Sequence, residues 1–171
     1  MSVTTNGGEL AYGDGHLRKI LRSVQTIAMV GLSPRWNRPS YFAMKYLQAK
    51  GYRVNPVNPG AAGEVILGET CHAALADVPG RIDMVDIFRD AEAAGAVVDE
   101  AIALKDEKGI KCIWMQLGIR HDEAARKAED AGLTVIMDRC VKIEFGRLSG
   151  ELSWGGINSG IISSRRRKLI A

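Results

Sequence analysis

The chain has 171 residues, of which 46% are hydrophobic, and this size and composition suit one globular domain with a single core. Its formal net charge of +3 is too small to indicate a nucleic-acid-binding protein, and no apolar run reaches the 18 residues that a membrane span needs. The amino-terminal stretch MSVTTNGGELAYG lacks the charged and then apolar profile of a signal peptide, so we expect a cytoplasmic protein.

The first half of the chain predicts two helices and two strands. Residues 1–13 are polar and small, and we expect them to be disordered or loosely attached. Asp14 is predicted to cap the first helix and Ser40 the second, with Gly51 just past the end of the second helix. The stretch TIAMVG is apolar throughout, which is typical of a strand buried on both faces. The predicted elements are a helix over 15–23, a strand over 26–31, a helix over 40–50 and a strand over 52–59.

The second half continues the alternation after a glycine-rich loop, a short EVILG piece and a short helix near 71–76. Asp90 opens one helix, and His121 stands at the start of another, where capping is the simple interpretation. This alternation predicts an α/β fold, a Rossmann-like doubly wound parallel five-stranded sheet flanked by helices. The predicted elements are strands over 82–88, 111–116 and 134–138 and helices over 90–105 and 121–132.

The carboxyl-terminal segment differs from the rest in composition. From Arg139 onward there are seven basic and two acidic residues, and the last stretch, EFGRLSGELSWGGINSGIISSRRRKLIA, is rich in glycine and serine. We expect a domain over 14–147 and an irregular extension over 148–171 with a free basic end. The apolar part of this extension could pack on the sheet edge or mediate a homodimer or a contact with a protein partner. The basic run lacks the support that a nucleic-acid or membrane role needs.

The stretch IAMVGLSPRWNRPS forms the junction between the first predicted strand and its helix. In a doubly wound sheet, ligands bind beyond the carboxyl ends of the strands, and the amino end of a helix suits a phosphate. Gly31 lets the backbone approach a ligand, and Ser33 and Ser40 offer hydroxyl groups. Arg35 and Arg38 can neutralise phosphate charge. The junction therefore predicts a site for a phosphorylated nucleotide.

The nicotinamide fingerprint and the P-loop both fail in this junction. Ser33 and Trp36 occupy the second and third glycine positions of the pattern GxGxxG, and the second strand ends in PVNP without an acid. No GK[ST] sequence follows. Two alternatives stay open, an oxidoreductase that uses NAD(P) and an interaction protein whose nucleotide pocket is vestigial.

Several separated blocks of the sequence resemble a known family. They are VGLS…NRPSY…KYLQAKGYRVNPVNP, LGET, DMVDIFR, WMQLGI and MDRCVKIE, in that order. Together they are similar to the stand-alone coenzyme A (CoA)-binding proteins of the YccU type, and through them to the amino-terminal domain of the succinyl-CoA synthetase alpha subunit. The resemblance covers roughly residues 15–147. It implies a Rossmann-like fold and a small-molecule ligand, CoA or acyl-CoA, bound as a cofactor, and it implies no catalysed reaction.

The resemblance also implies site residues at the ends of four predicted strands. Those after the first strand would hold the pyrophosphate, and those after the second would line the adenosine side. Those after the third would border the adenine and reach toward the 3′-phosphate, and those after the fourth would face the pantetheine. They are Gly31, Leu32, Ser33, Arg38, Pro39 and Ser40 for the pyrophosphate, Val57, Asn58 and Pro59 for adenosine, Phe88 and Arg89 for adenine, and Gln116 and Gly118 for pantetheine.

The chain departs from the family pattern at two places. A lysine that often follows the VNP segment is replaced by Gly60-Ala61-Ala62, and Trp36 stands where the turn often has a proline. Arg35 or the basic tail could compensate for the lysine.

The sequence favours a non-catalytic module that senses acyl-CoA or presents the cofactor to a partner, since the chain is too short for the further domains of succinyl-CoA synthetase. Cys71, Cys112 and Cys140 lie far apart, so we expect free thiols that are buried or partly buried, and neither a disulfide framework nor a metal site. Cys140 follows the fifth predicted strand, so its thiol could approach the ligand and exchange with the CoA sulfur.

Overall fold

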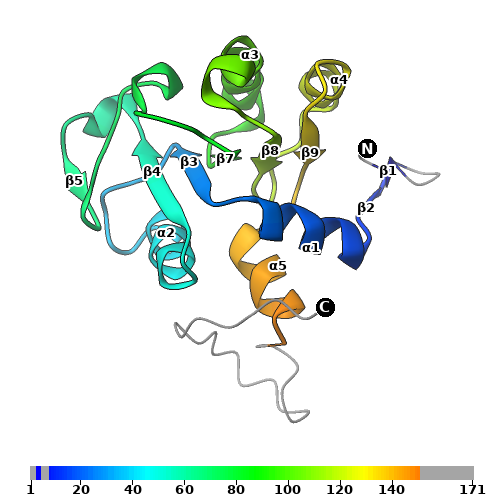
Figure 1. Cartoon of the computed structure of the whole chain (residues 1–171), viewed down its shortest axis with the longest axis horizontal. Helices are drawn as coiled ribbons and strands as arrows, with labels where there is room; N and C mark the ends of the chain where they lie inside the picture. The colour runs from blue at the N-terminus through cyan, green and yellow to red at the C-terminus, as the bar shows by residue number, and fades with distance from the viewer. Residues whose placement is uncertain (1–2, 5–7, 151–171) are drawn as a thin grey trace.

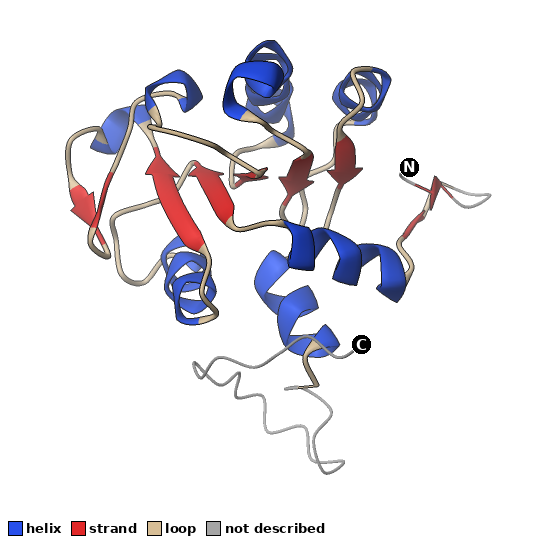
Figure 2. Cartoon of the chain, viewed as in Figure 1, coloured by secondary structure: helices blue, strands red, loops and turns tan. Residues whose placement is uncertain are grey.

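The structure of the protein, a computed structural model, describes residues 3–4 and 8–150. Five parallel strands form its central sheet, and each pairs with its neighbour in register (Figures 1 and 2). Their spatial order is β4 (Arg53–Val57), β3 (Thr26–Val30), β7 (Met84–Ile87), β8 (Cys112–Met115) and β9 (Thr134–Ile136). This arrangement confirms the predicted Rossmann-like α/β fold.

Helices cover both faces of the sheet (Figure 1). Successive side chains of a strand point to opposite faces, so Ile27 and Met29 of β3 join one core while Ala28 and Val30 join the other. Both cores are apolar, which explains why the strands read as continuous hydrophobic runs. One face carries α1 (Asp14–Ser23), α2 (Pro39–Ala49) and α5 (Val141–Leu148), and the other carries α3 (Ala91–Lys108) and α4 (Asp122–Asp130).

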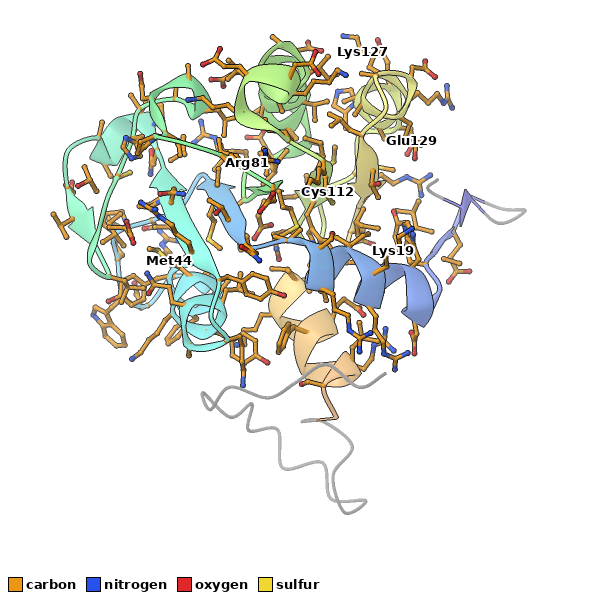
Figure 3. All side chains as sticks on the ribbon, viewed as in Figure 1. Lys19, Met44, Arg81, Cys112, Lys127 and Glu129 are labelled. Atoms are coloured by element: carbon orange, nitrogen blue, oxygen red, sulfur yellow. The ribbon has the colours of Figure 1, made fainter. Side chains whose placement is uncertain are left out.

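Figure 3 shows the side chains that lie between the helices and on their outer surfaces. Met44 of α2 and Cys112 of β8 are buried in the layer under α1, α2 and α5. On the opposite face, Lys127 of α4 reaches Asp99 of α3, with 2.9 Å between Nζ and Oδ1. Both layers pack by apolar contact, and an ion pair joins helices on each face, Lys127 with Asp99 on one and Arg147 with Asp14 on the other.

The helix α5 was not among the elements predicted from the sequence, and it ends at Leu148, where the irregular extension was expected to begin. Val141, Phe145 and Leu148 are buried, and their spacing puts them on one face of the helix. The ring of Phe145 meets the rings of Tyr46 and Tyr52 edge to face. The glycine and serine content of the segment hid this short apolar stripe. Most of the predicted extension, residues 151–171, lies outside the described residues.

The described part of the amino-terminal segment is fastened to the domain. A two-residue strand, β1 (Val3–Thr4), pairs antiparallel with β2 (Leu10–Ala11). Leu10 is buried, and the hydroxyl oxygen of Tyr12 accepts a hydrogen bond of 2.9 Å from the N–H of Met137. The prediction of loose attachment is therefore wrong for residues 8–13, because pattern analysis could not find these distant partners.

Two of the predicted helix caps are wrong. The helix α1 begins at Asp14 itself, after Gly13, without a side-chain cap. The helix α2 begins at Pro39, so Ser40 lies inside its first turn rather than before it. Proline suits the first helical position because its fixed φ matches the helix and its missing N–H has no partner there.

Two other helix starts follow the prediction. The carboxylate of Asp90 accepts a hydrogen bond of 2.9 Å from the N–H of Ala93 at the start of α3. The Nδ1 atom of His121 accepts one of 3.1 Å from the N–H of Ala124 at the start of α4. His121 is thereby explained as a capping residue.

The segment between β4 and β7 returns along the free edge of β4. The N–H of Asn58 donates to the carbonyl oxygen of His72, and the N–H of His72 donates to Pro56, each at 2.9 Å. Proline is tolerated in β4 because the strand lies at the sheet edge. The segment contains the 3₁₀ turns η1 (Pro59–Ala61) and η2 (Leu75–Asp77) and the hairpin β5 (Val65–Ile66) and β6 (Glu69–Thr70), with η2 close to the predicted short helix.

The thiols are free, as expected. Cys71 and Cys112 are buried and Cys140 is half-buried. Within residues 3–4 and 8–150, no helix is both long and apolar enough to cross a membrane. In the same part of the chain, no group of three or more His, Cys, Asp or Glu side chains is placed to hold a metal ion.

Asp83 lies at the end of the sheet where the parallel strands begin, and its carboxylate holds the backbone at the start of β3. Its Oδ2 accepts hydrogen bonds of 3.0 Å from the N–H groups of Gln25 and Thr26, and Lys111 lies 3.5 Å from its Oδ1. Burial alone would raise the pKa of Asp83, but the two N–H groups and the Lys111 ammonium together hold the pKa below its ordinary value.

We predict that Asp83→Ala lowers the free energy of unfolding by about 1–3 kcal/mol at neutral pH, because charge-assisted hydrogen bonds are lost. A carboxyl whose folded pKa is lowered stabilises the fold above about pH 4 and loses this effect as the pH falls through the folded pKa. The difference from the wild type should therefore shrink in acid, as urea unfolding at several pH values would measure. Asp106→Ala, at an exposed side chain, is the control. Equal effects of the two variants would contradict this role.

Candidate functional site

The candidate site lies where the chain changes from one face of the sheet to the other. The helix α2 follows β3 on one face, whereas α3 follows the neighbouring strand β7 on the opposite face (Figure 1). The connections therefore diverge beyond the carboxyl ends of β3 and β7 and leave a crevice there, which is where ligands bind in folds of this kind. Gly31 and Phe88 are the first residues past these two strands.

Gly31 brings three strand ends together. Its φ is +86°, and its N–H donates a hydrogen bond of 2.8 Å to the carbonyl oxygen of Val57 at the end of β4. A Cβ at this position would lie 2.6 Å from the carbonyl oxygen of Phe88 and 2.7 Å from Cδ of Arg89. Gly31 was predicted to let the backbone approach a ligand; the close approach that the structure shows is to the end of β7.

The turn after Gly31 is tied to the start of α2. The N–H of Ser33 donates a hydrogen bond of 3.0 Å to Oγ of Ser40, and Oγ of Ser33 accepts one of 3.2 Å from the N–H of Arg35. The N–H of Arg38 then donates to the carbonyl oxygen of Arg35 at 3.1 Å. Ser40 thus acts as an acceptor for the turn, which explains why this serine follows the first helical residue.

Asn58 holds the turn from the side of β4. Its Nδ2 donates a hydrogen bond of 2.9 Å to the carbonyl oxygen of Leu32, and its Oδ1 accepts one of 3.0 Å from the N–H of Gly60. Leu32 and Val57 are buried beneath the turn, whereas Pro59 is exposed. The asparagine side chain is thus engaged in positioning the backbone.

A polar cleft of about 460 Å³ opens above this turn. The charged side chains that line it, Arg35 and Arg38, are both basic, and both are exposed. The amino terminus of α2 lies in its wall and adds partial positive charge. The cleft therefore suits an anionic group. Its lining residues are Gly31, Ser33, Arg35, Arg38, Pro39, Ser40 and Phe88.

A second, mainly apolar groove of about 640 Å³ adjoins the cleft and shares Pro39 and Phe88 with it. Phe42, Leu117 and Ile143 have 47%, 58% and 40% of their surface exposed, and such large apolar side chains on a surface favour a ligand contact. The other lining residues are Asn37, Ala43, Gln116, Ile119, Cys140 and Lys142.

A buried polar pair lies at the base of this groove. Nε2 of Gln116 donates a hydrogen bond of 2.7 Å to Oδ1 of Asp86, and Asp86 is completely buried. Its other oxygen, Oδ2, is buried without a partner among the described residues. Burial raises the pKa of Asp86 to about 7, even though the hydrogen bond from Gln116 lowers it.

The structure brings only part of the predicted site residues into these two hollows. Phe88 lines both hollows, and Leu32, Val57 and Asn58 shape the turn from behind. Arg89 covers Gly31, while the N–H of Gly118 donates to Asp138 at 2.7 Å. Pro59, Arg89 and Gly118 are not among the lining residues. Those that line the cleft are Gly31, Ser33, Arg38, Pro39, Ser40 and Phe88, and Gln116 lines the groove.

The side chains that the helices α2 and α5 contribute to the groove were missed by the sequence analysis. Phe42 lies one turn into α2, and Ile143 and Lys142 lie on α5, a helix that was not predicted. The available signal was the spacing of Val141, Phe145 and Leu148, which puts three apolar side chains on one face of a helix.

Comparisons with known proteins identify a family and similar folds. A model of the family described as "CoA binding domain" matches residues 25–146, a stretch that includes every residue lining the cleft and the groove. The protein YneT of Bacillus subtilis (strain 168), itself described as uncharacterized, is 35% identical over 127 residues, which cover 74% of this chain and 90% of YneT.

Two solved structures are similar along most of the chain. The crystal structure of a PH1109 protein redesigned for binding superposes with a TM-score of 0.76 at 39% identity, covering 84% of this chain and 97% of that one. A protein from Thermus thermophilus superposes with a TM-score of 0.74 at 37% identity, covering 80% of this chain and 98% of that one.

We predict that Gly31→Ala destabilises the fold more than Gly132→Ala. Both glycines have φ near +87°, so each alanine variant should lose about 1–2 kcal/mol in free energy of unfolding, because a residue with a Cβ disfavours the left-handed conformation. A Cβ at Gly132 meets no atom within 4 Å, whereas one at Gly31 collides with the carbonyl oxygen of Phe88. The difference between the two losses in free energy of unfolding, measured with urea, reports the close approach, and equal losses would refute it.

We also predict that Asp86 makes stability depend on pH near neutrality. An unfolded carboxyl binds its proton only below about pH 4, whereas Asp86 in the fold holds its proton up to about pH 7. The folded state therefore binds more protons in this range, so the free energy of unfolding falls as the pH rises.

Between about pH 5 and pH 8 the free energy of unfolding should fall less in Asp86→Asn than in the wild type, by a difference of more than about 1 kcal/mol. Thermal or urea unfolding across this range measures it, with the exposed-site variant Asp106→Asn as control. A pH profile of Asp86→Asn that matches the wild type would show that the carboxyl is not buried with a raised pKa.

Proposed function

The chain belongs to the CoA-binding domain family, and we propose that it binds CoA or an acyl-CoA across the polar cleft and the apolar groove. One observation carries this proposal. A hollow lined by two arginines and two serines at a helix amino terminus continues directly into an apolar hollow. CoA has the same division, a phosphorylated nucleotide at one end and a largely apolar pantetheine arm at the other.

The pyrophosphate would lie in the cleft. The amino terminus of α2 contributes partial positive charge and hydroxyl groups of Ser33 and Ser40 lie beside it. Arg38 supplies a full charge at the first turn of the helix. Arg35 lines the same cleft, so we assign it the role of the lysine that is absent at Gly60-Ala61-Ala62.

The pantetheine arm would follow the groove toward Cys140. The exposed rings and chains of Phe42, Leu117 and Ile143 offer the apolar surface that its methyl and methylene groups need. The side-chain amide of Gln116 is the polar group along this wall. Since Phe88 lines both hollows, we assign it to the junction of pyrophosphate and pantetheine rather than to the adenine.

The adenosine would lie on the other side of the cleft, beyond β4. The groove extends from β3 toward β7 and β8, so the end of β4 is the side left for the nucleoside. Val57, Asn58 and Pro59 are retained for this role, with contact made chiefly by backbone because the Asn58 side chain braces the turn. Arg89, exposed beside Gly31, is retained for the 3′-phosphate region.

The role that we infer is binding without catalysis in the cytoplasm. The residues that line the cleft supply arginine and hydroxyl groups for an anion, and these are groups that hold a ligand. Such a module would sense acyl-CoA or present it to a partner protein.

The test is a calorimetric titration with CoA, acetyl-CoA, 3′-dephospho-CoA, ADP and NADH. We predict that CoA or acetyl-CoA binds most tightly and that NADH does not compete with it. In Arg38→Ala the dissociation constant should rise about tenfold or more, because a charge-assisted hydrogen bond of about 1.5–3 kcal/mol is lost.

Arg53→Ala is the matched control, since Arg53 is exposed at the opposite end of β4. Its affinity for CoA should equal that of the wild type. Tighter binding of NADH than of CoA would favour the oxidoreductase alternative, and the absence of any thermal shift with all five nucleotides would favour the vestigial pocket.

A further inference from the structure

Cys140 is the thiol that lines the groove. It is the residue directly before α5, and that helix begins without a side-chain hydrogen bond to its first turn. Burial raises the pKa of the Cys140 thiol, and the backbone N–H groups of Ile143 and Lys142 offset this only in part. Cys140 is half-buried and faces the groove, so a ligand in the groove can reach its thiol.

An unpartnered carboxyl oxygen lies behind Gln116, which lines the groove together with Cys140. Asp86 is completely buried, its Oδ1 is held by Gln116, and its Oδ2 has no hydrogen-bond partner among the described residues. Gln116 and Cys140 both line the groove, and the charge of Asp86 acts on Cys140. A buried polar atom without a partner is costly, so this oxygen behind the wall of the groove favours a polar ligand group nearby.

The other two thiols are placed differently. Cys71 and Cys112 each have 2% of their surface exposed, and neither lines the cleft or the groove. Their sulfur atoms approach backbone carbonyl oxygens, at 3.6 Å from Asn58 for Cys71 and 3.6 Å from Ile113 for Cys112. They are therefore matched internal controls for Cys140.

We propose that Cys140 forms a reversible mixed disulfide with the thiol of CoA seated in the groove, so that the site can hold the cofactor covalently. This inference rests on the proposed function, because the thiol end of pantetheine reaches Cys140 only if the pyrophosphate occupies the cleft. It adds a redox-dependent mode of capture to a non-covalent site. An acyl-CoA, whose sulfur is blocked, would bind without it.

The reaction is a thiol–disulfide exchange with CoA disulfide as the oxidant. The thiolate of Cys140 attacks one sulfur of the CoA disulfide, the original S–S bond breaks, and a bond forms between Cys140 and that sulfur. The second CoA leaves as a thiolate and takes up the proton that Cys140 has released. An excess of a dithiol reductant reduces the mixed disulfide, which returns the thiols of Cys140 and CoA, and the reductant is oxidised to its own disulfide.

The environment of Cys140 also determines how the exchange depends on pH. Burial raises the pKa of the Cys140 thiol, and the N–H groups of Ile143 and Lys142 offset this in part. Of the charged groups on the neighbouring elements, Asp86 of β7 disfavours the thiolate and Lys142 of α5 favours it. The free thiol is thus protonated at neutral pH, and the exchange should accelerate as the pH rises.

The experiment treats the full-length reduced protein with CoA disulfide and measures intact mass over time, with and without a dithiol reductant. We expect one adduct of the mass of CoA less two hydrogens, which the reductant removes. Cys140→Ser and Cys140→Ala should both lack it, whereas Cys71→Ser and Cys112→Ser should retain it. With glutathione disulfide at equal concentration the adduct should form about tenfold more slowly or less, because only CoA is positioned by the site.

Desulfo-CoA, which lacks the sulfur, separates this inference from the proposed function. It should bind to the wild type, and it should slow the formation of the adduct there. Binding of desulfo-CoA without any adduct from CoA disulfide, or an adduct that persists in Cys140→Ser, would overturn the role of Cys140 while leaving CoA binding intact. Failure of desulfo-CoA and CoA to bind at all would overturn both.

Discussion

The close approach of Gly31 to the carbonyl oxygen of Phe88 is the constraint on which the site depends. A side chain at Gly31 would collide with the end of β7, and the N–H of Gly31 is already bonded to the end of β4. The carboxyl ends of β3, β4 and β7 therefore lie close together around Gly31. The turn that follows can only leave the sheet above the crevice, so the amino terminus of α2 comes to lie in the cleft wall.

One helix then contributes to both parts of the site. Pro39 and Ser40, in the first turn of α2, lie in the polar cleft, whereas Phe42 and Ala43 line the apolar groove. Partial positive charge is concentrated at the helix end, and apolar side chains begin a turn later. The helix therefore matches a ligand that is anionic at one end and apolar at the other, and α5 supplies the far wall of the groove.

The errors of the sequence analysis share a physical cause. The strands and the long helices were predictable because each carries its own periodic apolar pattern. The helix α5 was missed because its stripe is short, and the segment 8–13 was misjudged because Leu10 and Tyr12 gain their order from residues more than a hundred positions away. Local patterns hold no information about such partners.

The sequence by itself determined the α/β class, the strand–turn–helix junction after Gly31 and the resemblance to CoA-binding proteins, because these depend on residues close together in the chain. Only the tertiary structure decided that Phe88 lines both hollows, that Asn58 braces the turn, and that Cys140 lines the groove above the buried pair of Asp86 and Gln116. These residues come from different strands, and they meet only because the spatial order of the sheet places those strand ends side by side.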